Sequence, residues 1–199
     1  SLIKKYNLLP YGYDLLIARL EPENSIEIIL EGVAKSKVKR PFLVIGKHET
    51  KYGDYLKTLF ADADHIRFLG GIYDMAMVNN IRYFSNLYFH GHTVGGTNPS
   101  LLEAMSSSAL ICANDNAFNS YILGKDALYF QNASDVSRHL DMVRYEHPEC
   151  QQMIVNNLEK IEEKYSWDKI IDAYAKHFYD ITGRLAAEPV MLEENEALL

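Results

Sequence analysis

The segment "HGHTVGGTNPSLLEAM", residues 90–105, contains residue types that bind phosphate and sugar groups. Gly95 and Gly96 allow the backbone to approach a ligand closely and to adopt positive φ without steric cost. A helix that begins at Pro99 would direct free backbone N–H groups and a partial positive charge toward an anion such as a diphosphate. Glu103, one turn into that helix, could accept hydrogen bonds from neighbouring sugar hydroxyls. The combination predicts a nucleotide-sugar pocket.

Each of these features also has an ordinary structural explanation. A glycine pair before a helix is common in turns, and a glutamate in the first turns of a helix commonly balances the helix dipole. Arg19 ends the first predicted strand, where its guanidinium could clamp a diphosphate at the same edge of the sheet. It could equally form a surface ion pair with Glu21 or Glu23, and the residues alone favour neither interpretation.

Two histidines and an Asn-Asp-Asn sequence lie near this segment. His90 and His92 are two apart on a predicted strand, so their imidazoles face the same side, as two metal ligands could. No Asp or Glu lies within several residues of them, so we expect a pocket-lining or hydrogen-bonding role, for His92, and no metal. Residues 114–116 predict a turn more strongly than a sugar contact. The glycine spacing does not fit an NAD site, and we expect no cofactor.

The elements that would position these residues alternate along the chain. Short apolar runs alternate with helical patterns, which predicts an α/β fold, a Rossmann-like parallel sheet of about six strands with helices on both faces and extra C-terminal helices. In such sheets ligands bind beyond the carboxyl ends of the strands. The predicted strands are residues 13–19, 42–46, 66–69, 87–90, 110–113 and 128–130, and the predicted helices are residues 25–34, 52–60, 74–84, 99–107, 118–123, 134–145, 151–165 and 167–181.

Three polar residues are predicted to cap helices: Asn24, Asp74 and Asn98, the last before a first-turn proline. Cys112 lies in an apolar run and is expected in the core, which fits a reducing, cytoplasmic environment.

The composition limits the class of protein. The chain has 199 residues, of which 48% are hydrophobic and 24% charged, and a net charge of -7 that argues against a nucleic-acid partner. No apolar run approaches the roughly 20 residues of a membrane span. We expect residues 1–183 to form one domain and residues 184–199 a loose acidic tail. The chain lacks an initiator Met, and we expect it to be part of a longer protein.

Over nearly its whole length, the sequence resembles the nucleotide-binding lobe of the group 1, GT-B type retaining glycosyltransferases. "ARLEPENSIEIILEG" resembles their first strand and helix, "IRFLGGIYDMAMVNNIRYFSNLYFHGH" their third and fourth units, and "SWDKIIDAYAKHFYDI" their closing helices. More narrowly, "HGHTVGGTNPSLLEAM" with "ANDNAFN" resembles the rhamnosyltransferases that build bacterial surface polysaccharides.

The resemblance implies roles for individual residues. The second of the family's two glutamates matches Glu103, which is implied to bind the ribose or deoxyribose of the nucleotide. The first falls on Gly95, so the backbone amides of Gly96, Thr97 and Asn98 are expected to take over its contact with the donor sugar.

The resemblance also implies which residues contact the diphosphate and the base. The family's diphosphate arginine matches Arg19, but its lysine falls on Asn24, which leaves one fixed cation and more reliance on the helix start. The loop that holds the base matches residues 69–73. The predicted site therefore comprises Arg19 and Glu103 as catalytic residues and Gly95, Gly96, Thr97, Asn98, Ser100, His92, Gly71 and Tyr73 as substrate-binding residues.

The activity implied by the resemblance is sugar transfer, of L-rhamnose from dTDP-L-rhamnose to a glycan or lipid-linked acceptor in polysaccharide synthesis. An N-terminal domain of the same protein, outside this chain, would hold the acceptor at the cytoplasmic face of the inner membrane, with which the full-length protein could associate peripherally. The chain alone would then bind nucleotide and turn over little. Two alternatives are a non-catalytic nucleotide-binding module and a sugar-nucleotide epimerase of similar two-lobed architecture.

Overall fold

The computed structural model describes residues 5–183, and the chain divides into two compact units, Ser1–Ile161 and Glu162–Leu199. The first unit contains a six-stranded sheet, and the second contains helix α9 (Trp167–Thr182). The predicted domain boundary at residue 183 stays a prediction, and the predicted acidic tail, residues 184–199, lies outside the described residues.

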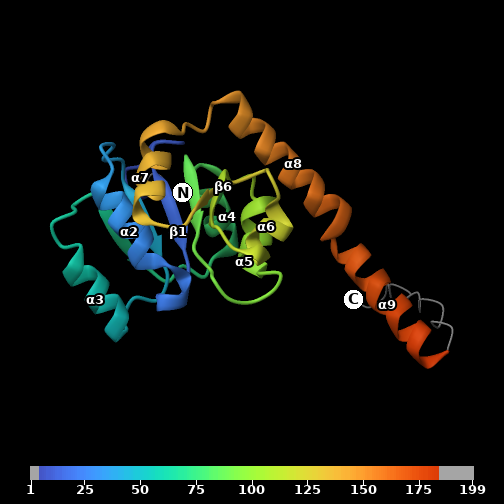
Figure 1. Cartoon of the computed structure of the whole chain (residues 1–199). Helices are drawn as coiled ribbons and strands as arrows, with labels where there is room; N and C mark the ends of the chain where they lie inside the picture. The colour runs from blue at the N-terminus through green and yellow to red at the C-terminus, as the bar shows by residue number, and fades with distance from the viewer. Residues whose placement is uncertain (1–4, 184–199) are drawn as a thin grey trace, which may run out of the picture. The chain divides into compact units, whose positions relative to one another are not determined.

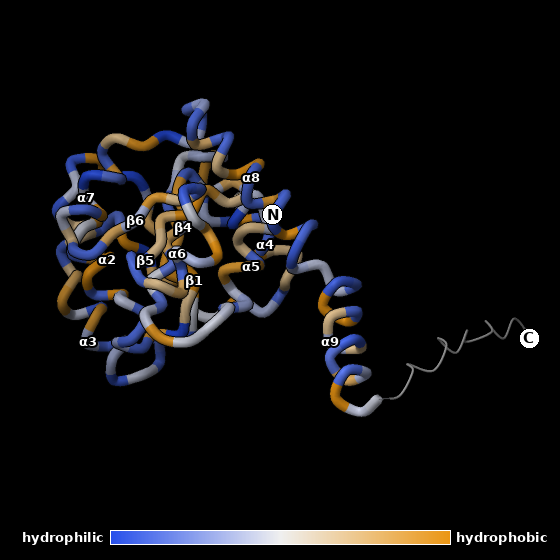
Figure 2. The backbone as a smooth tube through the Cα atoms, turned by 45° about the vertical axis from the view of Figure 1, so that its right-hand side comes forward, coloured by the Kyte–Doolittle hydropathy of each residue, from blue (hydrophilic) through white to orange (hydrophobic). Residues whose placement is uncertain are grey.

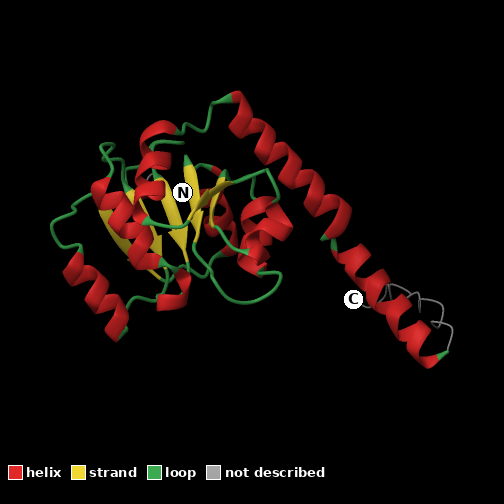
Figure 3. Ribbon diagram, in the orientation of Figure 1, coloured by secondary structure: helices red, strands yellow, loops and turns green. Residues whose placement is uncertain are grey.

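The sheet is entirely parallel, with strand order β3-β2-β1-β4-β5-β6 (Figures 1 and 3). The chain builds outward from β1 to β3 and then returns to pair β4 with the other side of β1, so the direction of winding reverses between β1 and β4. The predicted Rossmann-like α/β fold is therefore confirmed. The strands are β1 Asp14–Ile17, β2 Phe42–Ile45, β3 Ile66–Gly70, β4 Leu87–His90, β5 Ile111–Asn114 and β6 Leu128–Phe130.

Helices cover both faces of this sheet, as Figure 3 shows. Each helix predicted from the sequence within the described residues is present, with ends that differ by a few residues. A short 3₁₀ turn, η1 (Pro22–Asn24), precedes the first of them and was not predicted. The helices are α2 Ile26–Lys35, α3 Lys51–Leu59, α4 Met75–Tyr83, α5 Pro99–Ser106, α6 Ala117–Leu123, α7 Ala133–Met142 and α8 Pro148–Lys164, followed by α9 in the second unit.

The core lies between the sheet and α2 with α7. Val33 of α2 and Val136 of α7 are both fully buried and belong to one cluster with side chains of β2, β4 and β5, including Cys112 at 0% exposure. Each such side chain contributes roughly 1.5–3 kcal/mol on burial. The tube in Figure 2 is correspondingly apolar along the central strands, whereas apolar and polar residues alternate along α9.

Two of the three predicted helix caps are confirmed. Oδ1 of Asp74 accepts a hydrogen bond from the Met77 N–H at 3.1 Å, and Asn98 caps α5. The predicted cap at Asn24 is wrong, because η1 intervenes and the Asn24 side chain instead donates to the Arg19 carbonyl at 2.7 Å. Within residues 5–183, no helix is long and apolar enough to cross a membrane.

Candidate functional site

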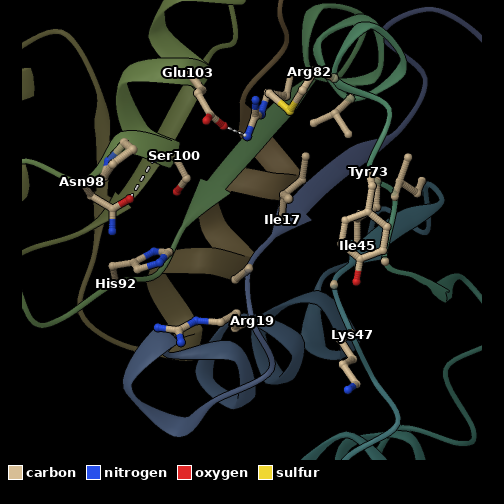
Figure 4. Close-up of a pocket in the computed structure, with 17 residues that line it drawn as sticks. Ile17, Arg19, Ile45, Lys47, Tyr73, Arg82, His92, Asn98, Ser100 and Glu103 are labelled. Carbon is tan, nitrogen blue, oxygen red and sulfur yellow. Dashed lines mark hydrogen bonds and ion pairs between the residues drawn. The ribbon is translucent and has the colours of Figure 1, made fainter.

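A cavity of about 680 Å³ opens where the winding of the sheet reverses (Figure 4). Its size lies within the roughly 300–1,000 Å³ of ordinary ligand pockets. Loops that follow β1, β2, β3 and β4 line it, together with α4 and the start of α5, so it occupies the position where doubly wound sheets bind ligands. The lining residues are Ile17, Ala18, Arg19, Ile45, Gly46, Lys47, Gly71, Ile72, Tyr73, Met75, Val78, Arg82, His92, Asn98, Pro99, Ser100 and Glu103.

Most residues proposed from the sequence meet at this cavity. Three of them do not line it: Gly95, Gly96 and Thr97, which lie in the exposed loop before α5. Their roles in binding, like those of the lining residues, stay predictions. The residues that do line it are Arg19, Glu103, Asn98, Ser100, His92, Gly71 and Tyr73.

The loop between β4 and α5 is fixed at its start and open farther along. A Cβ on Gly91 would collide with the carbonyl oxygen of Asn24, so only glycine fits there. Thr93 then donates from both its backbone N–H and its hydroxyl to the Glu23 carbonyl, at 3.1 and 2.8 Å. Gly95 has φ of +109°, and no atom lies within 4 Å of a Cβ built on it. No side chain therefore fills the space around this glycine.

The start of α5 offers fewer free donors than predicted. Pro99 has no N–H, the Ser100 N–H donates to Oδ1 of Asn98 at 3.0 Å, and the Leu101 N–H donates to the Asn98 carbonyl at 3.0 Å. The expectation that the amides just after Pro99 are free is thus wrong, because the cap already uses them. In the described part of the chain, the backbone N–H groups of residues 95–98 make no hydrogen bond, and these are the amides open to a ligand.

Two exposed cations border the cavity. Arg19 forms no ion pair with any residue between 5 and 183, so the alternative of a surface pair with Glu21 or Glu23 is not observed. Lys47 follows β2 and was missed, since nothing in its local sequence separates it from other surface lysines. The expectation that Arg19 is the one fixed cation at the diphosphate stays a prediction, and Lys47 is a second cation beside the cavity.

An ion pair between a buried arginine and a partly exposed glutamate occupies the other end of the cavity. Arg82 of α4 is 2% exposed, and its Nη2 donates to Oε2 of Glu103 at 2.8 Å. In Figure 4 this pair lies apart from Arg19 and His92. The sequence indicates such a pair, because Arg82 lies on the same face of helix α4 as Val78 and Ile81, which are both apolar and buried. An arginine on that face requires a partner.

The two histidines stack on each other at the edge of the cavity, with ring centroids 4.4 Å apart and planes inclined by 15°. Burial, and after it the neighbouring His92 and Arg82, lower the pKa of His90 to about 3. Burial and then Arg19 lower the pKa of His92, so both imidazoles are neutral near pH 7. Among the described residues, no three His, Cys, Asp or Glu side chains gather as a metal site would need.

The Asn-Asp-Asn sequence after β5 has a structural role. Oδ1 of Asn116 accepts from the N–H groups of Phe118 and Asn119 and caps α6, and its Nδ2 donates to the His92 carbonyl at 3.0 Å. Asp115 accepts from Gln131 at 2.8 Å. The turn interpretation therefore holds, and this cap anchors the backbone of a cavity residue.

Several solved structures with the same fold are glycosyltransferases, although no match is found by sequence comparison. No family model matches the sequence, and a comparison with curated proteins finds no match. HepE from Anabaena, crystallised with UDP and glucose, is 13% identical with a TM-score of 0.75 over 90% of this chain and 51% of HepE. A glycosyltransferase from Rickettsia africae is 14% identical with a TM-score of 0.76, over 90% of this chain and 50% of that protein.

The chain thus spans about half the length of these two proteins. A third structure shows which half such a fold can be: the C-terminal domain of a group 1 glycosyl transferase (LpcC) from Francisella tularensis is 17% identical, with a TM-score of 0.68 over 82% of this chain and 91% of that domain. The chain therefore has the fold of one lobe of a GT-B glycosyltransferase.

Proposed function

We propose that this chain is the donor-binding part of a glycosyltransferase and that its cavity holds a nucleoside diphosphate sugar. The observation that carries the proposal is the placement of Arg19 and Glu103 on one cavity at the switch point of the sheet. Arg19 and Lys47 supply positive charge for a diphosphate, and the free amide of Asn98 at the cavity, with those of Gly96 and Thr97 in the adjoining loop, supplies donors for the sugar. Glu103 lies toward the opposite end, where it can accept from the pentose.

In the proposed reaction, the bond between the anomeric carbon of the sugar and the diphosphate oxygen breaks. The oxygen of an acceptor hydroxyl bonds to that carbon, the nucleoside diphosphate leaves with the electrons of the broken bond, and the departing diphosphate takes up the hydroxyl proton. Negative charge grows on the diphosphate as the bond breaks, and the guanidinium of Arg19 stabilises it most at that point. Tyr73, which is 84% exposed at the cavity, is available to stack on the base.

The finer assignments follow the family resemblance. We propose dTDP-L-rhamnose as the donor and a glycan or lipid-linked acceptor at the cytoplasmic face of the inner membrane. A second lobe of the same protein, N-terminal to this chain, would bind the acceptor. Supporting this, HepE and the Rickettsia africae glycosyltransferase are each about twice as long as the segment that this chain matches.

Calorimetric titration of the chain with dTDP tests the proposed pocket. Arg19→Ala and Glu103→Ala should each weaken binding roughly 10-fold to 100-fold, since a charged hydrogen bond contributes roughly 1.5–3 kcal/mol. Arg138→Ala and Glu31→Ala serve as matched controls. Each removes the same charge as one of the cavity variants, but from an ion pair outside the cavity. Wild-type affinity in both cavity variants would refute the proposed site.

A further inference from the structure

Asn24 is a polar residue that is buried next to Arg19 and does not itself line the cavity. It ends the 3₁₀ turn η1, is 3% exposed, and donates from Nδ2 to the Arg19 carbonyl at 2.7 Å. Helix α2 begins after Ser25, so the Asn24 side chain does not cap that helix. A buried amide is costly to leave without a partner, and this hydrogen bond therefore holds Asn24 and the backbone of Arg19 together.

Arg19 needs such a bond because it lies beyond the end of its strand. The parallel pairing of β1 with β2 stops at Ile17, so the sheet does not hold the backbone of Arg19. The Arg19 carbonyl instead accepts from the Glu21 N–H at 2.9 Å and from Asn24. Both donors belong to the turn that follows β1, whereas Arg19 itself is exposed and lines the cavity. The turn therefore fixes the point from which this cation reaches a ligand.

The same turn is fixed to the loop between β4 and α5. The Glu23 carbonyl accepts both hydrogen bonds that Thr93 donates. A Cβ on Gly91 would lie 2.0 Å from the Asn24 carbonyl oxygen, so the two backbones are in direct contact. Asn24 thus joins two loops, with its side chain bonded to the loop after β1 and its carbonyl packed on the loop that continues to the free amides of residues 95–98. It sets the position of the cation relative to that second loop.

We propose that Asn24 is a positioning residue that holds Arg19 where its guanidinium meets a diphosphate. This inference rests on the proposed function, because the diphosphate belongs to the nucleotide in the same cavity. An arginine side chain loses rotamer freedom when it binds an anion, and a backbone that must also be ordered adds to this loss. The bond from Asn24 orders the Arg19 backbone before the ligand arrives, and a preorganised cation binds the anion more tightly. Asn24 acts through Arg19 and not by contact with the ligand.

A double-mutant cycle with Arg19 tests this role, with dTDP as the ligand and NMR titration of the chain as the measurement. Asn24→Leu removes the donor and keeps a side chain of similar volume. In the wild-type background it should weaken dTDP binding roughly 3-fold to 10-fold, which is about the effect of one hydrogen bond. In an Arg19→Ala background the same change should leave the affinity for dTDP unchanged, because the cation that Asn24 positions is absent.

Asn157→Leu is the matched control. Asn157 is 1% exposed and donates from Nδ2 to the Asp126 carbonyl at 2.7 Å, so this change removes an equivalent hydrogen bond outside the cavity. Urea unfolding checks that both leucine variants remain folded. Asn157→Leu should bind dTDP with the affinity of the wild type, since the asparagine it replaces does not contact Arg19.

A second variant is available if Asn24→Leu does not fold. Thr93→Val keeps the shape of a partly exposed side chain and removes the hydroxyl that donates to the Glu23 carbonyl at 2.8 Å. This change loosens the turn that carries Asn24 at its contact with the loop between β4 and α5. It should weaken dTDP binding less than Asn24→Leu would, and this weakening should also disappear in the Arg19→Ala background.

The outcomes separate this inference from the function beneath it. Failure of dTDP to bind the wild-type chain would overturn the proposed function, and the inference with it. Wild-type affinity in a folded Asn24→Leu chain would overturn the inference alone. Equal weakening in the two backgrounds, or the same weakening in Asn157→Leu, would also overturn it, since a purely structural asparagine affects binding without Arg19.

Discussion

The buried histidine His90 should make the stability of the first unit fall as the pH is lowered. His90 is 1% exposed in the central strand β4, and neither of its ring nitrogens has a hydrogen-bond partner. Burial of the ring disfavours an added proton most, and the neighbouring His92 and Arg82 add to this effect. Its pKa is therefore lowered to about 3, whereas an unfolded chain has a histidine pKa of about 6.5.

The sign and size of the effect follow from proton linkage. Between pH values of about 6.5 and 3, the unfolded chain binds a proton at this histidine and the folded chain does not. The free energy of unfolding therefore decreases as the pH is lowered through this range. Each pH unit in that window changes it by about 1.36 kcal/mol, so lowering the pH from about 7.5 to about 5 should cost roughly 2 kcal/mol through His90 alone.

Urea unfolding followed by circular dichroism measures this loss. Trp167, the single tryptophan, lies in the second unit, so its fluorescence would not report on the sheet. His90→Leu keeps an apolar side chain in a buried strand and removes the titrating group. Groups that do not touch His90 titrate in both proteins, and their effect cancels in the difference. The wild type should lose roughly 2 kcal/mol more than His90→Leu over this pH range, and equal losses would refute the assigned burial.

Three further perturbations test other parts of the structure. Gly91→Ala should lower the free energy of unfolding of the first unit by about 1–3 kcal/mol in urea unfolding, because the new Cβ would collide with the Asn24 carbonyl. An unchanged unfolding midpoint would contradict this backbone contact. Arg40→Met should cost about 3–5 kcal/mol, because Asp14 is 2% exposed and would lose its 3.0 Å ion pair, whereas Asp14→Asn combined with Arg40→Met should recover part of the loss. Acrylamide should quench Trp167 readily in this chain, since it is 78% exposed, and a protected tryptophan would contradict that exposure.

The fold could be predicted because its signals are local. The runs "FLVI" and "ICA" are apolar on both faces, which requires a buried parallel strand, and the helices between them carry their own caps at Asp74 and Asn98. The failure at Asn24 has a physical cause. After Pro22 the chain makes a 3₁₀ turn that ends with Ser25 at φ of +50°, so the side chain of Asn24 is turned toward Arg19 rather than toward the helix.

The site residues that could be predicted are those whose role is indicated by the sequence immediately around them. Arg19 and Glu103 could be proposed from their places after a strand and early in a helix. Lys47 was not proposed, because an exposed lysine after a strand carries no local signal that separates it from other surface lysines. The amides after Pro99 were assigned to a ligand because a helix start leaves donors free in general, but this helix satisfies them with Asn98.

Under the proposed function, the pairing of Arg82 with Glu103 would allow a carboxylate to share the cavity with a diphosphate. An unpaired carboxylate would repel the phosphates, and the whole chain already carries a net charge of -7. Because Arg82 neutralises Glu103 from within the core, Arg19 and Lys47 remain as uncompensated charges on the cavity wall, and Figure 4 places both away from the ion pair. The cavity therefore has a positive end and a neutral, hydrogen-bonding end. Under the proposed function, that difference would orient a nucleoside diphosphate with its phosphates toward Arg19 and its pentose toward Glu103.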